Sequence, residues 1–178
     1  MSDFNQTLEI GDFKNGFINT VVEIPMGSNL KIEWDRKRAA FTLDRIEPAI
    51  FAKPVNYGFI PQTIDEDGDE LDTLVLCDYS IPTGVWLKAK IIGLLNFIDD
   101  GDNDYKIICV PADNRDNNDL IQDFNDLSQR WKQKIEFHFN HYKDLKKKNS
   151  TEVKGWEDEK AAIKIISECQ KRFLSKQR

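Results

Sequence analysis

Apolar and polar positions alternate in short runs over the first two-thirds of the chain, and this pattern predicts β-strands. Between Leu30 and Trp34, for example, the apolar side chains share one face, and Lys31 and Glu33 share the other, because successive strand residues point to opposite faces. Turn-forming residues separate the runs. The predicted strands are Phe17–Ile24, Leu30–Trp34, Ala40–Leu43, Leu71–Cys77, Val85–Ile98 and Tyr105–Val110.

The last third changes to a helical period. Two apolar stripes carry it, Trp131, Ile135, Phe139 and Tyr142 in the first and Ala162, Ile165, Ile166, Cys169 and Phe173 in the second. Strands followed by helices, without β-α-β alternation, indicate an α+β class with a mainly β core. We expect a single domain over residues 1–178, built as a small closed antiparallel OB-like β-barrel with the C-terminal helices packed outside.

The composition fits a globular protein, and its negative charge argues against non-specific electrostatic binding to nucleic acid. The chain has 178 residues, of which 40% are hydrophobic and 31% charged, with a formal net charge of −6. Cys77, Cys109 and Cys169 are widely spaced in apolar runs, which favours buried free thiols over a secreted disulfide framework. Because the sequence shows neither a secretory signal nor a run long enough to span a bilayer, a cytoplasmic location is expected.

Two acidic clusters supply the most informative chemistry. Six of the eight residues from Asp65 to Asp72 are carboxylates, and Asp99, Asp100, Asp102 and Asp104 form a second cluster after a predicted strand. Two carboxylates about 4 Å apart repel by about 4 kcal/mol at an effective dielectric constant near 20. Bound cations relieve such repulsion, and two clusters in one small domain suggest a multi-metal site. Carboxylates without nearby His or Cys favour Mg²⁺ or Mn²⁺ over Zn²⁺.

Neither cluster is an EF-hand. That loop needs Gly at its sixth position and Glu at its twelfth, whereas a loop starting at Asp65 places Glu70 and Leu76 there and one starting at Asp100 places Tyr105 and Pro111. A charged turn in solvent remains the alternative for either cluster taken alone.

The first acidic cluster, with the element from Asp67 to Asp72, belongs to an ordered set of motifs. This set resembles the soluble inorganic pyrophosphatases of family I, in their bacterial form. The resemblance runs from about Phe17 to the C-terminal helix. It rests on Val22-Glu23-Ile24-Pro25, Lys31-Ile32-Glu33, Asp44-Arg45, Asn56-Tyr57-Gly58-Phe59-Ile60-Pro61, Asp67-Gly68-Asp69-Glu70-Leu71-Asp72, Asp99-Asp100, Asp104-Tyr105-Lys106, His141-Tyr142-Lys143-Asp144-Leu145 and Gly155-Trp156.

The resemblance implies Mg²⁺-dependent hydrolysis of inorganic pyrophosphate to two orthophosphates by a metal-activated water or hydroxide. Asp69 is the implied general base. The implied metal ligands are Asp67, Asp72, Asp99 and Asp104, with Glu33 for a metal that arrives with substrate; several Mg²⁺ ions are expected, with Mn²⁺ as a possible substitute. Glu23 and Asp100 are implied to lie next to these ligands and to orient them without binding the metal directly. The implied phosphate-binding residues are Lys31, Arg45, Tyr57, Lys106, Tyr142 and Lys143.

Two positions depart from the family pattern. Lys53 precedes Pro54 where many members carry Tyr, and Phe137 stands about where several bacterial members carry an interface histidine. The resemblance still implies a homo-oligomer, with a hexamer favoured and Trp131, Phe137 and His141 as candidate interface residues.

Three other hypotheses stay open from the sequence. An OB-type barrel could bind oligonucleotides, although such modules carry a basic groove with exposed aromatics. A metal-buffering protein without turnover would also use acidic clusters. Finally, the residues specify metal and phosphate better than the rest of a substrate, so a different phosphoanhydride is possible.

Overall fold

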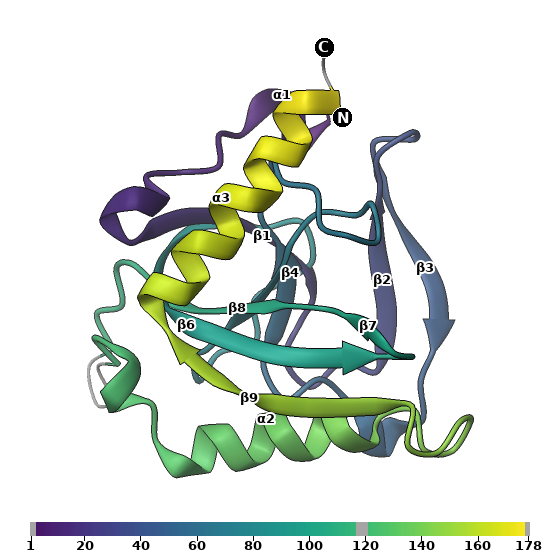
Figure 1. The fold of residues 1–178 in the computed structure, drawn as a ribbon. Helices are drawn as coiled ribbons and strands as arrows, with labels where there is room; N and C mark the ends of the chain where they lie inside the picture. The colour runs from purple at the N-terminus through teal and green to yellow at the C-terminus, as the bar shows by residue number, and fades with distance from the viewer. Residues whose placement is uncertain (1–2, 117–120, 177–178) are drawn as a thin grey trace.

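The core of the protein is a closed ring of hydrogen-bonded β-strands (Figure 1). The computed structural model describes residues 3–116 and 121–176. Around the ring the order is β1, β4, β5, β8 and β6, and β6 pairs with β1 to close it. These pairings are antiparallel except for the parallel pair β5–β8. The bounds are β1 Phe17–Ile24, β4 Asn56–Phe59, β5 Asp72–Val75, β6 Trp86–Asp99 and β8 Lys106–Pro111.

The remaining elements surround this ring. Strand β9 pairs with β6, the short β7 follows the end of β6, and β2 and β3 form a separate hairpin beside the barrel (Figure 1). Helix α3 packs on β6 and β9, while α2 packs on β9. The bounds are β2 Leu30–Asp35, β3 Ala40–Ile46, β7 Asp102–Asn103, β9 Thr151–Asp158, α1 Phe4–Thr7, α2 Gln129–His141 and α3 Glu159–Lys176, with single turns of 3-10 helix at Phe13–Asn15, Ala49–Phe51 and Phe124–Asp126.

Strand β6 is buried on both faces and joins two halves of the core. Ile91 and Leu94 pack with Ile166 of α3, whereas Leu95 packs with Phe139 of α2. This double burial explains why β6 reads as a nearly continuous apolar run.

Gly58 brings β1 and β4 unusually close. A Cβ atom at this position would lie 2.0 Å from the carbonyl oxygen of Val21, so every other residue would force the two strands apart. Glycine therefore fixes the position of its neighbour Tyr57, which faces the cavity described below.

The mainly β closed core and its outer helices confirm the predicted fold class, and the predicted strands are all present with small shifts at their ends. The sequence reading missed α1, β4, β7 and β9, and β9 lies between the two helices, so the order of strands first and helices later is wrong for this segment. In the part of the chain that the structure describes, no helix is long and apolar enough to cross a membrane.

Candidate active site

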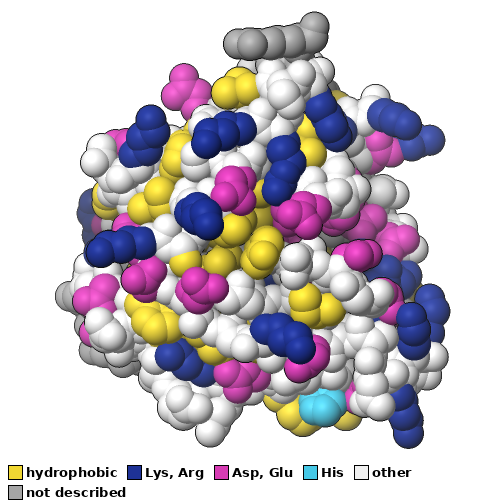
Figure 2. Space-filling model, in the orientation of Figure 1, with side chains coloured by type: hydrophobic (Ala, Val, Ile, Leu, Met, Phe, Trp, Pro, Cys, Tyr) yellow, Lys and Arg dark blue, Asp and Glu magenta, His cyan; other side chains and the backbone are white. Residues whose placement is uncertain are grey.

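One cavity of about 350 Å³ gathers nearly all the predicted site residues, and its size falls in the usual range for small-molecule sites. Figure 2 shows carboxylates gathered with lysine and arginine side chains on the side of the molecule where β2 and β3 lie. The predicted residues that line the cavity are Glu23, Lys31, Glu33, Arg45, Tyr57, Asp67, Asp69, Asp72, Asp99, Asp104, Lys106, Tyr142 and Lys143. Asp100 is not among the lining residues; it lies on the turn after β6, where it pairs with Lys143 at 3.0 Å.

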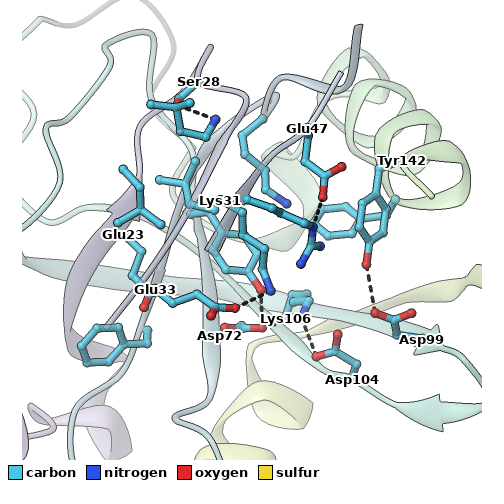
Figure 3. Close-up of a pocket in the computed structure, with 18 of the residues that line it drawn as sticks. Glu23, Ser28, Lys31, Glu33, Glu47, Asp72, Asp99, Asp104, Lys106 and Tyr142 are labelled. Atoms are coloured by element: carbon cyan, nitrogen blue, oxygen red, sulfur yellow. Dashed lines mark hydrogen bonds and ion pairs between the residues drawn. The ribbon is translucent and has the colours of Figure 1, made fainter. Parts of the chain in front are cut away.

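Lys106 joins two predicted metal ligands at the floor of the cavity. The parallel pairing of β5 and β8 places Asp72 beside Lys106 in register. The Lys106 ammonium donates to the carboxylates of both Asp72 and Asp104 (Figure 3), and the lysine is only 2% exposed. The Tyr57 hydroxyl also donates to Asp72. Burial opposes the charge on Lys106, but Asp72 and Asp104 outweigh it and raise its pKa, so the lysine stays cationic at neutral pH.

The end of β6 and the end of α2 together form a second side of the cavity. Tyr142 follows the last turn of α2, and its hydroxyl donates to Asp99 at 2.9 Å (Figure 3). Lys143 donates to Asp99 as well as to Asp100. Burial raises the pKa of the Tyr142 hydroxyl, with Asp99 adding to the shift, so this phenol remains a neutral donor.

The hairpin β2–β3 forms the opposite wall. Lys31 and Glu33 pair on one face of β2, as the strand period predicts. The register shifts after Lys31, where Asp44 is the extra residue on β3. Arg45 donates to both Asp44 and Glu47, so this wall holds a lysine and a guanidinium beside acidic partners.

A second irregularity turns Glu23 toward the cavity. Val22 and Ile24 pair with consecutive residues of β4, which leaves Glu23 as the extra residue of a β-bulge. Its carboxylate accepts a hydrogen bond from the backbone N–H of Trp34 at 2.7 Å. Burial raises the pKa of Glu23 well above its usual range, and Asp72 adds to the shift.

The loop before β5 carries Asp67 and Asp69 at the cavity edge. The Asp65 N–H donates to the Asp69 carbonyl at 2.7 Å, and the Gly68 N–H donates to the Asp65 carbonyl at 3.1 Å. Gly68 has φ +98°, which favours glycine. Both aspartate side chains are thereby presented from one tight turn, and the Asp67 carboxylate accepts the Asp69 N–H at 3.0 Å.

The acids are close enough to raise one another's pKa. Burial raises the pKa of Asp104 to about 6, with Asp72 and Asp67 adding to the shift and Lys106 opposing it. Burial also raises the pKa of Asp69, and Asp67 and Glu70 contribute. Such repulsion between carboxylates is relieved by bound cations.

The donor set fits a hard divalent cation. Within residues 3–116 and 121–176, no three His, Cys, Asp or Glu side chains already form a ready-made ion cage; instead, Lys106 lies between Asp72 and Asp104. The sequence-based expectation of carboxylates converging on a shared ion is therefore not met by a preformed cluster. Mg²⁺ is usually held by one or two carboxylates together with waters and substrate phosphates, and the paired acids here suit that mode of binding.

Sequence reasoning missed the role of two acids. Glu47 and Glu70 line the cavity. Arg36 holds the Glu70 carboxylate through two contacts of 2.9 Å each, from Nε and Nη2, and the Asn5 amide adds a third of 2.5 Å. Glu70 was visible only as one more acid of the cluster, because its partners come from distant parts of the chain.

His138 supports Tyr142 from within α2. The two rings stack with centroids 5.6 Å and planes 13° apart. The buried His138 Nε2 has no hydrogen-bond partner among the described residues. Burial lowers the pKa of His138 to about 3, and the nearby Lys53 contributes, so the folded protein keeps this imidazole neutral.

We expect His138 to make the fold sensitive to acid. As the pH is lowered from 6.5 to 4.5, the unfolded chain binds a proton at this residue and the folded chain does not. The free energy of unfolding therefore decreases by about 2 kcal/mol because of this group. Urea unfolding of wild type and His138→Phe at the two pH values, without divalent cations, measures the difference. The variant should lose less stability; equal losses in the two proteins would contradict the assignment.

Comparison with known proteins gives one consistent family. The family model described as Inorganic pyrophosphatase matches residues 20–174. The chain is 58% identical to an inorganic pyrophosphatase of Neisseria meningitidis serogroup B, over 97% of this chain and 98% of that protein. A crystal structure of an inorganic pyrophosphatase from Neisseria gonorrhoeae superposes with a TM-score of 0.94 at 58% identity, over 97% of this chain and 99% of that one. The structure of the Thermus thermophilus enzyme has a TM-score of 0.86 at 38% identity, over 94% and 97% of the two chains.

Proposed function

The chain belongs to the inorganic pyrophosphatase family and hydrolyses inorganic pyrophosphate, and we propose that it does so with Mg²⁺ and with Asp69 as general base. The family uses divalent metal ions; Mg²⁺ in particular, with Mn²⁺ as a substitute, is our proposal. The observation that supports the proposal best is the cavity in which paired acids from separate elements face lysine, arginine and tyrosine side chains. Membership of an enzyme family also argues against the oligonucleotide-binding and metal-buffering alternatives.

The acids divide into ligands and supports. Divalent cations supply charge neutralisation for the phosphates and a more acidic water. Glu23 supports the site through the Trp34 N–H, and Asp100 holds Lys143 in place. The residues proposed to hold the ions are Asp67, Asp72, Asp99, Asp104 and Glu33.

The remaining residues orient the substrate and move one proton. Asp69 takes the proton of the attacking water, which requires a position within hydrogen-bond reach of that water. Arg45 binds phosphate oxygens through two parallel N–H groups, whereas Lys31, Lys106 and Lys143 act as point charges. Tyr57 and Tyr142 donate hydroxyl hydrogen bonds without adding charge. Positioning and electrostatics of this kind account for most of the catalysis of phosphoryl transfer.

The proposal predicts metal-dependent release of orthophosphate. Purified protein should release phosphate from pyrophosphate with Mg²⁺ present, and a chelator in excess should remove the activity. Mn²⁺ added beyond the capacity of the chelator should partly restore it. The measurement is orthophosphate formed per minute against a protein-free blank. Release that is unchanged by the chelator would refute the metal requirement.

Assembly into a homo-oligomer, with a hexamer favoured, is part of the same proposal. Phe137 is 63% exposed on α2 and contacts the His141 ring at a centroid distance of 4.9 Å. Trp131 is partly buried against the core, which leaves it less surface for a partner than Phe137 has. Light scattering tests the assembly, and a monomeric mass would contradict it.

A further inference from the structure

Lys53 differs from the other cations of the cavity because, among the described residues, no carboxylate forms an ion pair with it. Lys31, Arg45, Lys106 and Lys143 each pair with at least one acid. Lys53 lines the same cavity, yet within the described residues it makes no ion pair. Its ammonium instead lies over three aromatic rings, 4.7 Å from the centroid of Tyr57, 5.3 Å from Tyr142 and 5.5 Å from Phe139.

The backbone fixes the point from which Lys53 enters the cavity. The Lys53 N–H donates to the Ser28 carbonyl and its own carbonyl accepts the Gly27 N–H, both at 2.9 Å. Pro54 follows directly and restricts the backbone further. The lysine is therefore held from both ends, by its main chain and by the rings around its ammonium.

Lys53 is half-buried and lies among charges of both signs. Burial lowers its pKa to about 8; Lys106 and Lys31 also lower it, whereas Asp72 and Glu47 raise it. The direct contacts of its ammonium are ring faces rather than a carboxylate. The Tyr57 and Tyr142 rings that face it carry the hydroxyls bound to Asp72 and Asp99. An ammonium at this place lies beside two of the groups proposed to bind phosphate.

From these contacts we propose that Lys53 binds a phosphate oxygen of the substrate, as a further cation of the site whose charge is left free for that purpose. The inference rests on the proposed function and extends its set of phosphate-binding residues. It gives Lys53 a role in substrate affinity rather than in proton transfer, since no hydrogen bond or ion pair joins Lys53 to Asp69 among the described residues.

Substitutions that separate charge from packing test this role. Lys53→Met keeps an unbranched stem against the rings but removes the charge, and we expect KM for Mg²⁺-pyrophosphate to rise ~10-fold with kcat within ~3-fold of wild type. Lys53→Arg keeps a cation that also lies over aromatic rings and binds phosphate, and it should restore KM to within ~3-fold. If the methionine variant does not fold, Lys53→Gln replaces it.

Lys132 provides a matched control. Its ammonium lies 4.4 Å from the Phe124 centroid and 6.0 Å from the Trp156 centroid, away from the cavity. Lys132→Met therefore removes the same charge and the same kind of contact, and its KM and kcat should equal those of wild type.

Binding of inorganic orthophosphate, measured by calorimetry with Mg²⁺ present, separates this inference from the activity itself. Lys53→Met should bind orthophosphate ~10-fold more weakly than wild type. Wild-type KM and orthophosphate affinity in Lys53→Met would overturn the inference even though the enzyme is active. Equal impairment in the methionine and arginine variants, with a lowered Tm in both, would also overturn it, because it would indicate a packing role. Loss of turnover in every protein, wild type included, would instead contradict the proposed function, and the orthophosphate affinities would still decide the role of Lys53.

Discussion

Replacing Asp69 by asparagine should lower kcat for pyrophosphate by ~10²-fold or more while leaving the fold and metal binding intact. General base catalysis commonly contributes ~10²–10⁴-fold, and an amide of the same shape cannot accept the proton. The backbone of Asp69 closes the loop through its carbonyl, which accepts the Asp65 N–H. This contact does not involve the side chain, so the substitution leaves it in place.

Glu66→Gln is the matched control for this experiment. It removes one negative charge from the same loop, and among the described residues the exposed Glu66 side chain makes one hydrogen-bonded ion pair, with Arg172 at 3.4 Å. Steady-state kinetics, circular dichroism and calorimetric titration with Mg²⁺ should be run on both variants. If Asp69→Asn keeps a turnover within ~3-fold of the control, Asp69 is not the base.

The hydrophobic pattern predicted the barrel because most strands have one or both faces buried. Strand β1 has the predicted bounds, Phe17–Ile24, and the long β6 reads as an apolar run. Strand β4 could not be found in the same way, because Asn56–Phe59 is short and contains Gly58, which weakens the strand signal. Strand β9 is rich in charged residues, and its pairing with the distant β6 rather than its own sequence makes it a strand.

The candidate site was predictable where strand period or motif order applied. Alternation placed Lys31 with Glu33, and Asp104 with Lys106, and the structure confirms both pairs as ion pairs. Long-range register was not predictable: nothing in the sequence indicates that β5 and β8 run parallel and place Asp72 beside Lys106. The free charge of Lys53 was likewise invisible, because it depends on which acids pair with the other cations.

Replacing Lys106 by methionine is expected to affect both catalysis and stability. The variant loses a charged group in the phosphate site, and charge-assisted hydrogen bonds are worth about 1.5–3 kcal/mol, so kcat/KM should fall by ~10²-fold. It also leaves Asp72 and Asp104 without their shared ammonium. Removing one partner of a buried ion pair costs about 3–5 kcal/mol; because both acids are partly exposed, at 22% and 24%, we expect a loss of about 3 kcal/mol in the free energy of unfolding.

The same variant should become more dependent on divalent cations for its stability. Burial and Asp72 already raise the pKa of Asp104 while Lys106 opposes the shift, so removing the lysine strengthens repulsion that a bound cation can relieve. Guanidinium unfolding with and without Mg²⁺ measures this, since a ligand that binds only the folded state stabilises it. Lys143→Met serves as the comparison: its side chain is 22% exposed, against 2% for Lys106, and its loss should cost under ~1 kcal/mol. A Lys106→Met protein as stable as wild type without metal, and no more responsive to Mg²⁺, would show that the lysine does not neutralise these carboxylates in the folded protein.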